Sequence, residues 1–361
     1  MKLELRSLSV STPGARDATR TWNARQSLLL RLVDPGGQTG LGEASPLPGY
    51  GTDTLEDAER ALRDVPVERL GASLERGTVL ETLIAISELV PAAVPSARMA
   101  LETAALDWLA RRAGVSAPAL LGAPSDSARP LSQLLGPASE PALVERATTA
   151  AQDGYHHFKL KLGGGTKLER ELENITALRE RLGSAAQLRL DANGALSEAE
   201  LERAWPVFEP VGIELFEEPG QVPPALISKL PLALDESLQG ATLKAIESAL
   251  LRSRPRCLVL KPTALGGLAH CWQAAELARR HGVSYFVSHA FEGALAWRSA
   301  AALAIALPAS AAHGLAPHAG LRGWPATAMP VAAGSLTAWG APGLGFDFDF
   351  DFDFEPLGEG T

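Results

Sequence analysis

The chain has 361 residues, of which 46% are hydrophobic and 21% are charged, and its formal net charge is −9. This composition is that of a soluble globular protein, and the acidic balance argues against a nucleic-acid or anionic-membrane partner. The length exceeds one simple core and predicts either two domains or one large barrel with an appendage.

The cysteines and the apolar runs bear on where the protein works. Cys257 and Cys271 have neither metal-binding spacing nor a disulfide pattern, which fits a reducing compartment. The first residues lack an apolar signal core, and the longest apolar run, 300–307, is too short to span a bilayer. We therefore expect a cytoplasmic protein.

The N-terminal third is predicted to form a small α+β domain over residues 1–125. The run 28–33 is typical of a strand and is followed by an Asp-Pro-Gly-Gly turn. Thr54 resembles a helix start, and 97–113 is an Ala/Leu-rich helix with Ser96 as its expected N-cap and Gly114 at its end.

From about residue 130, short apolar strands alternate with amphipathic helices, which predicts a parallel sheet with helical crossovers. The expected strands are 131–135, one within 156–162, 188–191, 213–216, 232–234, 257–260, 283–287 and 312–315. About eight strands suit a (β/α) barrel over residues 126–318. A doubly wound open sheet is the alternative, but the chain has no GxGxxG fingerprint after the first strand.

Residues 346–354 alternate Phe and Asp. This pattern fits an amphipathic strand laid over an apolar surface or, equally well, a compositionally biased segment. No chemistry is assigned to it.

Charged or polar side chains follow the predicted barrel strands. They are Lys159 and Lys161, Asp191, Glu217, Asp235, Lys261, and Ser288 with His289. Because the carboxyl ends of barrel strands converge on one mouth, these groups are expected to meet there. Each alone has an ordinary explanation as a solvated face or a helix cap, whereas the combination favours an active site.

Asp191, Glu217 and Asp235 are predicted to bind a divalent cation. Three carboxylates gathered at a mouth would repel one another, and a cation removes that repulsion. Three oxygens form half of a magnesium octahedron and leave room for water and a substrate carboxylate. No His or Cys joins the set, which disfavours zinc.

The lysines then gain a role as acid–base groups. A lysine beside a second lysine and near a cation has its ammonium form disfavoured and can act as a base. Lys159 and Lys161 approach from one strand, and Lys261 from the opposite side of the barrel. The predicted reaction class is proton abstraction next to a carboxylate.

These motifs resemble the enolase superfamily, in its muconate lactonising branch, and within it the o-succinylbenzoate synthases. The barrel motifs that carry the resemblance, in family order, are Lys159-Leu160-Lys161, Leu190-Asp191-Ala192-Asn193-Gly194, Phe216-Glu217-Glu218-Pro219, Leu234-Asp235-Glu236-Ser237 and Leu260-Lys261-Pro262. The N-terminal segment 42–50, Gly-Glu-Ala-Ser-Pro-Leu-Pro-Gly-Tyr, is similar to the synthase pattern. The likeness spans about residues 40–320.

The resemblance implies a (β/α)7β barrel under an α+β capping domain that the C-terminal segment 319–361 completes. It implies Mg²⁺, with Mn²⁺ as a substitute, on the three carboxylates. Lys161 would be the base, Lys159 its support and Lys261 an electrostatic stabiliser across the ring. Asn193, Arg189 and Ser288 match substrate-binding positions.

The implied reaction is the syn dehydration of 2-succinyl-6-hydroxy-2,4-cyclohexadiene-1-carboxylate to o-succinylbenzoate in menaquinone biosynthesis. It proceeds by lysine-mediated α-proton abstraction and a metal-stabilised enediolate. The substrate would be a small-molecule carboxylate, and the oligomeric state stays open.

Several alternatives stay open at this point. The same scaffold serves N-succinylamino acid racemases and dipeptide epimerases, a Schiff-base lyase would use one barrel lysine without a metal, and a non-catalytic binding protein could retain the fold. The stretch 288–293, Ser-His-Ala-Phe-Glu-Gly, departs from the Ser-rich synthase pattern. His289 either contacts substrate or bonds to a neighbouring loop. Residues 11–25 are expected to form a mobile loop over the site, with Arg16, Arg20 and Arg25 as candidate anion contacts.

Overall fold

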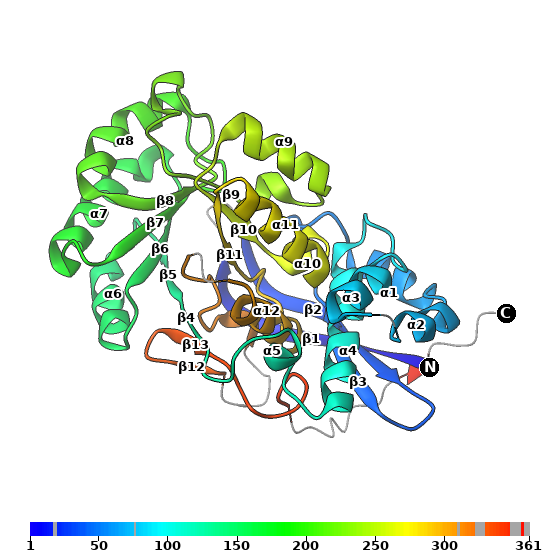
Figure 1. Ribbon diagram of the computed structural model, residues 1–361. Helices are drawn as coiled ribbons and strands as arrows, with labels where there is room; N and C mark the ends of the chain where they lie inside the picture. Colours follow the sequence, from blue (N-terminus) through cyan, green and yellow to red (C-terminus); the bar gives the residue numbers. More distant parts are fainter. Residues whose placement is uncertain (17–19, 76, 309–310, 322–328, 347–354, 357–361) are drawn as a thin grey trace.

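The computed structural model describes residues 1–16, 20–75, 77–308, 311–321, 329–346 and 355–356 (Figure 1). It confirms the mixed α/β architecture, with a parallel sheet curled into a barrel beside a smaller part built from an antiparallel sheet and helices. None of the helices in the described ranges combines the length and the apolar character needed to cross a membrane. Both cysteines are buried and free.

The capping part begins with an antiparallel sheet in the order β14-β1-β2-β3. Its strands are β1 (Lys2–Arg16), β2 (Thr21–Val33), β3 (Thr39–Ala44) and β14 (Glu355–Pro356). The helices that follow are α1 (Leu55–Arg63), α2 (Val67–Ser73), α3 (Val79–Ser87), α4 (Pro95–Ala113) and α5 (Ala117–Leu120). As predicted, Thr54 caps α1, in a capping box with Asp57.

Helix α4 is the central helix of the capping part. It is buried almost throughout, as expected for an Ala/Leu-rich helix without a polar face. A Cβ at Gly42 of β3 would lie 2.0 Å from the carbonyl oxygen of Ala100, so glycine is what lets the strand pack directly on the helix. Gly114 ends α4 in the left-handed conformation, as predicted.

The predicted N-cap of α4 is wrong by two residues. The helix starts at Pro95, which suits the first helical position because its missing N–H has no partner to lose there. Ser96 lies inside the helix, and its hydroxyl donates to Asp53 at 2.5 Å.

The barrel wall is a seven-stranded parallel sheet in the order β11-β10-β9-β8-β7-β6-β5. Its strands are β5 (Ser132–Pro137), β6 (His157–Lys161), β7 (Gln187–Asp191), β8 (Ile213–Glu217), β9 (Leu232–Leu234), β10 (Cys257–Leu260) and β11 (Ser284–Val287). Residues 313–314 form parallel bridges to Leu131 on one side and to Ser288 on the other. The eighth predicted strand is thus a short bridging segment that closes the barrel.

Helices cover the outside of this wall (Figure 1). They are α6 (Leu143–Gln152), α7 (Leu168–Leu182), α8 (Glu198–Val211), α9 (Leu243–Ser253), α10 (Pro262–Leu265), α11 (Leu268–Arg280) and α12 (Ala294–Ala306). The connection from β8 to β9 departs from the strict alternation, with only a 3₁₀ turn at Pro224–Leu226. Four prolines between 219 and 231 prevent a longer α-helix there.

The C-terminal segment contacts both parts of the molecule. Strand β13 (Ser335–Thr337) pairs with β12 (Val331–Ala332) on one side and with β4 (Ala128–Pro130), which leads into the barrel, on the other. Farther along, β14 pairs with β1 of the capping sheet. Most of the predicted Phe-Asp repeat, 347–354, lies outside the described residues.

Buried polar contacts join the two parts. The Glu102 carboxylate on α4 accepts the backbone N–H of Ala269, at the start of α11, at 2.8 Å. Glu43 at the end of β3 accepts the N–H of Gly293 at 2.8 Å, just before α12. Because both carboxylates are fully buried, these contacts fix the capping part on the barrel.

Candidate active site

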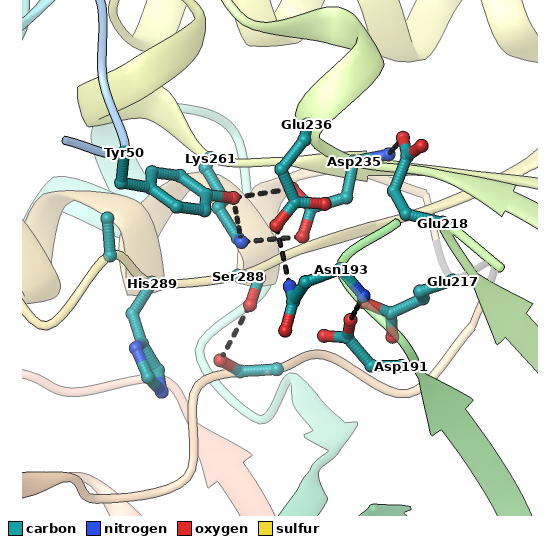
Figure 2. Close-up of polar contacts among 12 residues, drawn as sticks. Tyr50, Asp191, Asn193, Glu217, Glu218, Asp235, Glu236, Lys261, Ser288 and His289 are labelled. Atoms are coloured by element: carbon teal, nitrogen blue, oxygen red, sulfur yellow. Dashed lines mark hydrogen bonds and ion pairs between the residues drawn. The ribbon is translucent and has the colours of Figure 1, made fainter. Parts of the chain in front are cut away.

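The parallel strands bring the predicted charged residues to one end of the barrel. In register, Lys161 of β6 lies beside Asp191 of β7, which lies beside Glu217 of β8. Asp235 and Lys261 directly follow β9 and β10. All five side chains are buried. Figure 2 shows Asp191, Glu217, Asp235 and Lys261 turned toward one another.

The three carboxylates fit a divalent cation. Asp191, Glu217 and Asp235 each offer an oxygen, and the three atoms lie within 4.8 Å of one another. Oε1 of Glu217 is buried and has no hydrogen-bond partner among the described residues. An all-oxygen, buried set with an unsatisfied ligand atom suits Mg²⁺.

Lys159 and Lys161 contact this set from one side. Nζ of Lys159 lies 2.7 Å from Asp191 and also contacts Glu217. Nζ of Lys161 lies 2.5 Å from Asp191 and donates to Oδ1 of Asn193 at 3.0 Å. Asn193 is therefore placed to orient the second lysine.

These contacts shift the ionisation of the cluster. Burial alone would lower the pKa of Lys159, but Asp191 and Glu217 outweigh it and the pKa is raised. Burial would likewise raise the pKa of Asp191, but the two lysines hold it well below its usual range. Burial raises the pKa of Glu217 despite the contact with Lys159. The sequence led us to expect that the two lysines disfavour each other's charged form. With protein groups alone, the neighbouring carboxylates instead favour the charged form of Lys159.

Lys261 approaches from the opposite side of the mouth. Its ammonium lies 2.6 Å from Asp235 and also contacts the Tyr50 hydroxyl (Figure 2). The same hydroxyl donates to Asp235 at 3.0 Å. Tyr50 belongs to the capping part, so that part completes the barrel site.

Two further carboxylates support the candidate metal-ligand set. Glu218 accepts the backbone N–H of Asp235 at 2.7 Å and the N–H of Ser237 at 3.0 Å, which fixes the path of the chain behind Asp235. Glu236 accepts from the Asn193 side chain at 2.7 Å. Burial and the charge of Asp235 raise the pKa of Glu236 to about 8.

A cavity of about 210 Å³ opens beside the lysines. Lys159, Lys161 and Lys261 line one end, with Ser288 next to them. The Ser288 hydroxyl donates to the carbonyl of Gly314 at 3.2 Å. The remaining wall includes Trp22, Leu47, Tyr50, His289, Phe291 and His318.

Arg189 does not reach this cavity. Its guanidinium donates to Glu214 at 2.8 and 3.0 Å and to the carbonyl of Ala312 at 2.7 Å, and it lies over the Phe286 ring. In register it lies beside Lys159, one layer deeper in the barrel than Asp191. Arg189 is a buried ion-pair partner inside the barrel, and we remove it from the substrate contacts.

The predicted loop 11–25 is largely the end of a hairpin formed by β1 and β2. Arg25 is buried and donates to the carbonyls of Ser45 and Pro46 at 2.6 and 2.7 Å. Arg16 pairs with Glu140 at the end of the first barrel strand. Neither of them lines the cavity, nor does the exposed Arg20.

Sequence reasoning missed four residues of the site. Glu218 and Glu236 directly follow two metal-ligand candidates, and Tyr50 ends the quoted Ser-Pro-Leu-Pro-Gly-Tyr segment. The places of these three residues in the quoted motifs could have identified them as site residues. No pattern in the sequence pointed to His318.

Known proteins resemble this chain in sequence and in fold. A family described as enolase C-terminal domain-like matches residues 142–352. The chain belongs to the enolase superfamily. An o-succinylbenzoate synthase of Thermosynechococcus vestitus is 31% identical over 296 residues, covering 77% of this chain and 80% of that protein. An L-Lys-D/L-Arg epimerase of Methylococcus capsulatus is 30% identical over 310 residues, covering 82% and 83%.

Solved structures agree on the fold. The muconate lactonizing enzyme of Pseudomonas fluorescens, complexed with muconolactone, aligns with a TM-score of 0.79 and 23% identity over 96% of both chains. This likeness confirms the predicted fold, a barrel with a capping domain. Relatives of similar identity carry different activities, so the family alone does not select one.

Proposed function

We propose that this protein is an o-succinylbenzoate synthase. It would remove water from 2-succinyl-6-hydroxy-2,4-cyclohexadiene-1-carboxylate, a small-molecule carboxylate, as a step of menaquinone biosynthesis. Asp191, Glu217 and Asp235 would hold Mg²⁺, which when bound supplies a positive charge for the substrate carboxylate and for the negative charge that develops as the α-proton leaves. Support comes from the buried acidic set and from the synthase relative.

Lys161 is the proposed base. Its Nζ faces the cavity and is oriented by Asn193 at 3.0 Å. It takes the α-proton as the C–H bond breaks, and it returns that proton to the departing hydroxyl as the C–O bond breaks. One residue on one face accounts for a syn elimination in which water is the only other product. Lys159 adds a positive charge on the same face of the substrate.

The lining of the cavity is the observation that favours the synthase. Three lysines and two histidines contribute to the lining, and no Asp or Glu is among its described residues. A dipeptide with a free ammonium group would need a carboxylate partner in that space. The lining instead suits a substrate with two carboxylates and no cationic group.

Lys261 distinguishes the remaining candidates. In the synthase it acts as a cation across the ring, held by Asp235 and Tyr50. In an N-succinylamino acid racemase it would act as a second base. Lys261→Arg keeps the charge but not an amine that can exchange protons, so it should retain part of a dehydration activity and abolish a racemisation.

The test is an assay of purified protein with Mg²⁺ on the cyclohexadiene substrate and, in parallel, on N-succinyl amino acids and dipeptides. We expect dehydration, and Lys161→Ala to lower its rate by at least about 10³-fold, in the range of general-base catalysis. Lys167→Ala, on an exposed lysine of the following turn, is the matched control. Near-normal dehydration by Lys161→Ala would remove the base assignment.

The same assay distinguishes the synthase from the other candidate functions. EDTA should abolish dehydration, whereas a Schiff-base lyase would stay active and be trapped by borohydride with substrate. Turnover of N-succinyl amino acids alone would replace the synthase by a racemase. Binding without turnover of any substrate would indicate a non-catalytic protein.

A further inference from the structure

The end of the cavity away from the metal-ligand carboxylates is built around two histidines. His289 follows β11, and His318 lies beyond the segment that closes the barrel. Their ring centroids lie 3.8 Å apart with an interplanar angle of 30°. Figure 2 shows His289 on the side of Ser288 away from Asp191 and Glu217. The reaction outlined above gives this histidine pair no role.

Backbone contacts determine which nitrogen of each ring carries the proton. The N–H of Phe291 donates to Nδ1 of His289 at 3.3 Å, and the N–H of Gly320 donates to Nδ1 of His318 at 3.1 Å. A neutral imidazole whose Nδ1 accepts must carry its proton on Nε2. Neither Nε2 has a hydrogen-bond partner among the described residues. The pair thus holds two unused N–H donors beside the cavity.

The surroundings favour neutral rings and a negatively charged guest. Burial, with smaller contributions from His318 and the three lysines, lowers the pKa of His289 well below its usual value. Burial, aided by Arg25, lowers the pKa of His318 to about 3. The lysines and Arg25 place positive charge near the pair, and no Asp or Glu is among the described lining residues. An anion here would accept hydrogen bonds from the two Nε2–H groups and would meet no carboxylate among the described lining residues.

The wall around the pair is apolar and held in place. Phe291 lies edge-on to the His318 ring at 5.7 Å and 6.1 Å from the Trp22 ring. Phe291 has a φ of +57°, a left-handed conformation that is strained for an aromatic residue. Arg25 donates to the Phe291 carbonyl at 3.2 Å and so helps to hold that conformation. Strain maintained by buried contacts is typical of a binding site.

We propose that the Nε2–H groups of His289 and His318 bind the remote carboxylate of the substrate's acyl chain, with Trp22 and Phe291 covering the methylene groups. This proposal rests on the proposed function, which places the other carboxylate of the substrate at the metal end of the cavity. The histidine pair would then recognise the succinyl-type side chain of the substrate. Removing either donor should weaken binding of ligands that have that carboxylate and of no others.

The test compares two ligands that differ only at the end of the chain. With the Mg²⁺-loaded protein, the dissociation constants of 2-succinylbenzoate and of 2-butanoylbenzoate, which has a methyl group in place of the carboxylate, are measured by calorimetry. Hydrogen bonds to a charged group predict that wild type binds the succinyl compound about 10- to 100-fold more tightly. Equal affinities in wild type would overturn the proposal without the need for a variant.

Variants then test whether the two histidines cause the preference for 2-succinylbenzoate. His318→Phe and His289→Phe should each weaken 2-succinylbenzoate about tenfold or more and change 2-butanoylbenzoate less than about twofold. His318→Gln keeps an N–H donor and should restore part of the loss. His281→Phe, on an exposed histidine after α11, is the matched control. An equal loss for both ligands would show that the pair only shapes the wall.

The outcome separates this proposal from the proposed function. Dehydration by wild type combined with equal losses for the two ligands would refute the histidine pair and leave the synthase intact. Preferential loss for the succinyl ligand in a protein that does not dehydrate the cyclohexadiene would refute the synthase and leave the pair as a carboxylate site.

Discussion

The buried carboxyl of Glu102 predicts an unusual dependence of stability on pH. This side chain is fully buried on α4, where one oxygen accepts the N–H of Ala269 at 2.8 Å. The other oxygen has no partner among the described residues. Burial, only partly offset by the backbone N–H groups of Leu268 and Ala269, raises the pKa of Glu102 to about 8.

The perturbation is Glu102→Gln, which removes the titration and keeps an acceptor for the backbone N–H. In the unfolded chain a glutamate loses its proton near pH 4.3, whereas the folded chain keeps that proton up to about pH 8. Between these values the folded state binds one more proton, so the free energy of unfolding falls as pH rises, by about 1.4 kcal/mol per pH unit. From pH 5.5 to 7.5, the stability of the variant relative to wild type should therefore increase by roughly 3 kcal/mol.

The assay is urea unfolding followed by tryptophan fluorescence and circular dichroism at the two pH values. Comparing variant with wild type at each pH cancels the titration of all other groups. Glu180→Gln removes an exposed carboxylate on α7 and controls for the change in net charge. A stability difference that stays constant between the two pH values would refute the reasoning, because it would mean that Glu102 is ionised in the folded protein.

Further predictions concern the site and the core. Tyr50→Phe removes the contacts to Lys261 and Asp235 and should lower the rate of the proposed dehydration about tenfold in a steady-state assay while leaving the melting temperature within about 2 °C. Glu218→Gln weakens the support behind Asp235 and should raise the Mg²⁺ concentration for half-maximal activity about 10- to 100-fold in a metal titration; an unchanged titration would contradict that role. Trp297→Ala empties a fully buried position on α12 and should cost about 3–5 kcal/mol in urea unfolding, whereas a loss below 1 kcal/mol would show that the core collapses around it.

Much of the site could be predicted because barrel geometry turns chain order into spatial order. Each strand delivers its last residues to the same end, so Asp191, Glu217 and Asp235 had to converge once the strands were recognised. The alternation of Lys159 and Lys161 with apolar residues predicted only that both lie on one face of their strand. The carboxylates that end the following strands indicated that this face is the interior. Local signals worked equally well for helix ends, as at Gly114, which ends α4.

Depth within the barrel was not predictable in the same way. Arg189 points inward like Asp191, two residues earlier on the same strand, yet it lies one layer deeper and pairs with Glu214. The sequence shows that both face the interior but not which layer opens to a cavity, because this depends on how the neighbouring strands are staggered. Contacts between distant segments were equally invisible. Tyr50 and Lys261, for instance, are separated by 211 positions.

These long-range contacts would make the proposed chemistry depend on how the capping part sits on the barrel. Tyr50 reaches the barrel lysine Lys261, while Trp22 forms a wall of the cavity. Arg25 and Glu43, also from the capping part, bond to the backbone of Phe291 and Gly293, a few residues after His289. A displacement of the capping part would therefore disturb both ends of the cavity at once, the lysine at one end and the histidine pair at the other. Because the capping part supplies buried contacts at both ends, we expect the proposed choice of substrate and the positioning of the proposed reacting groups to be coupled in this fold.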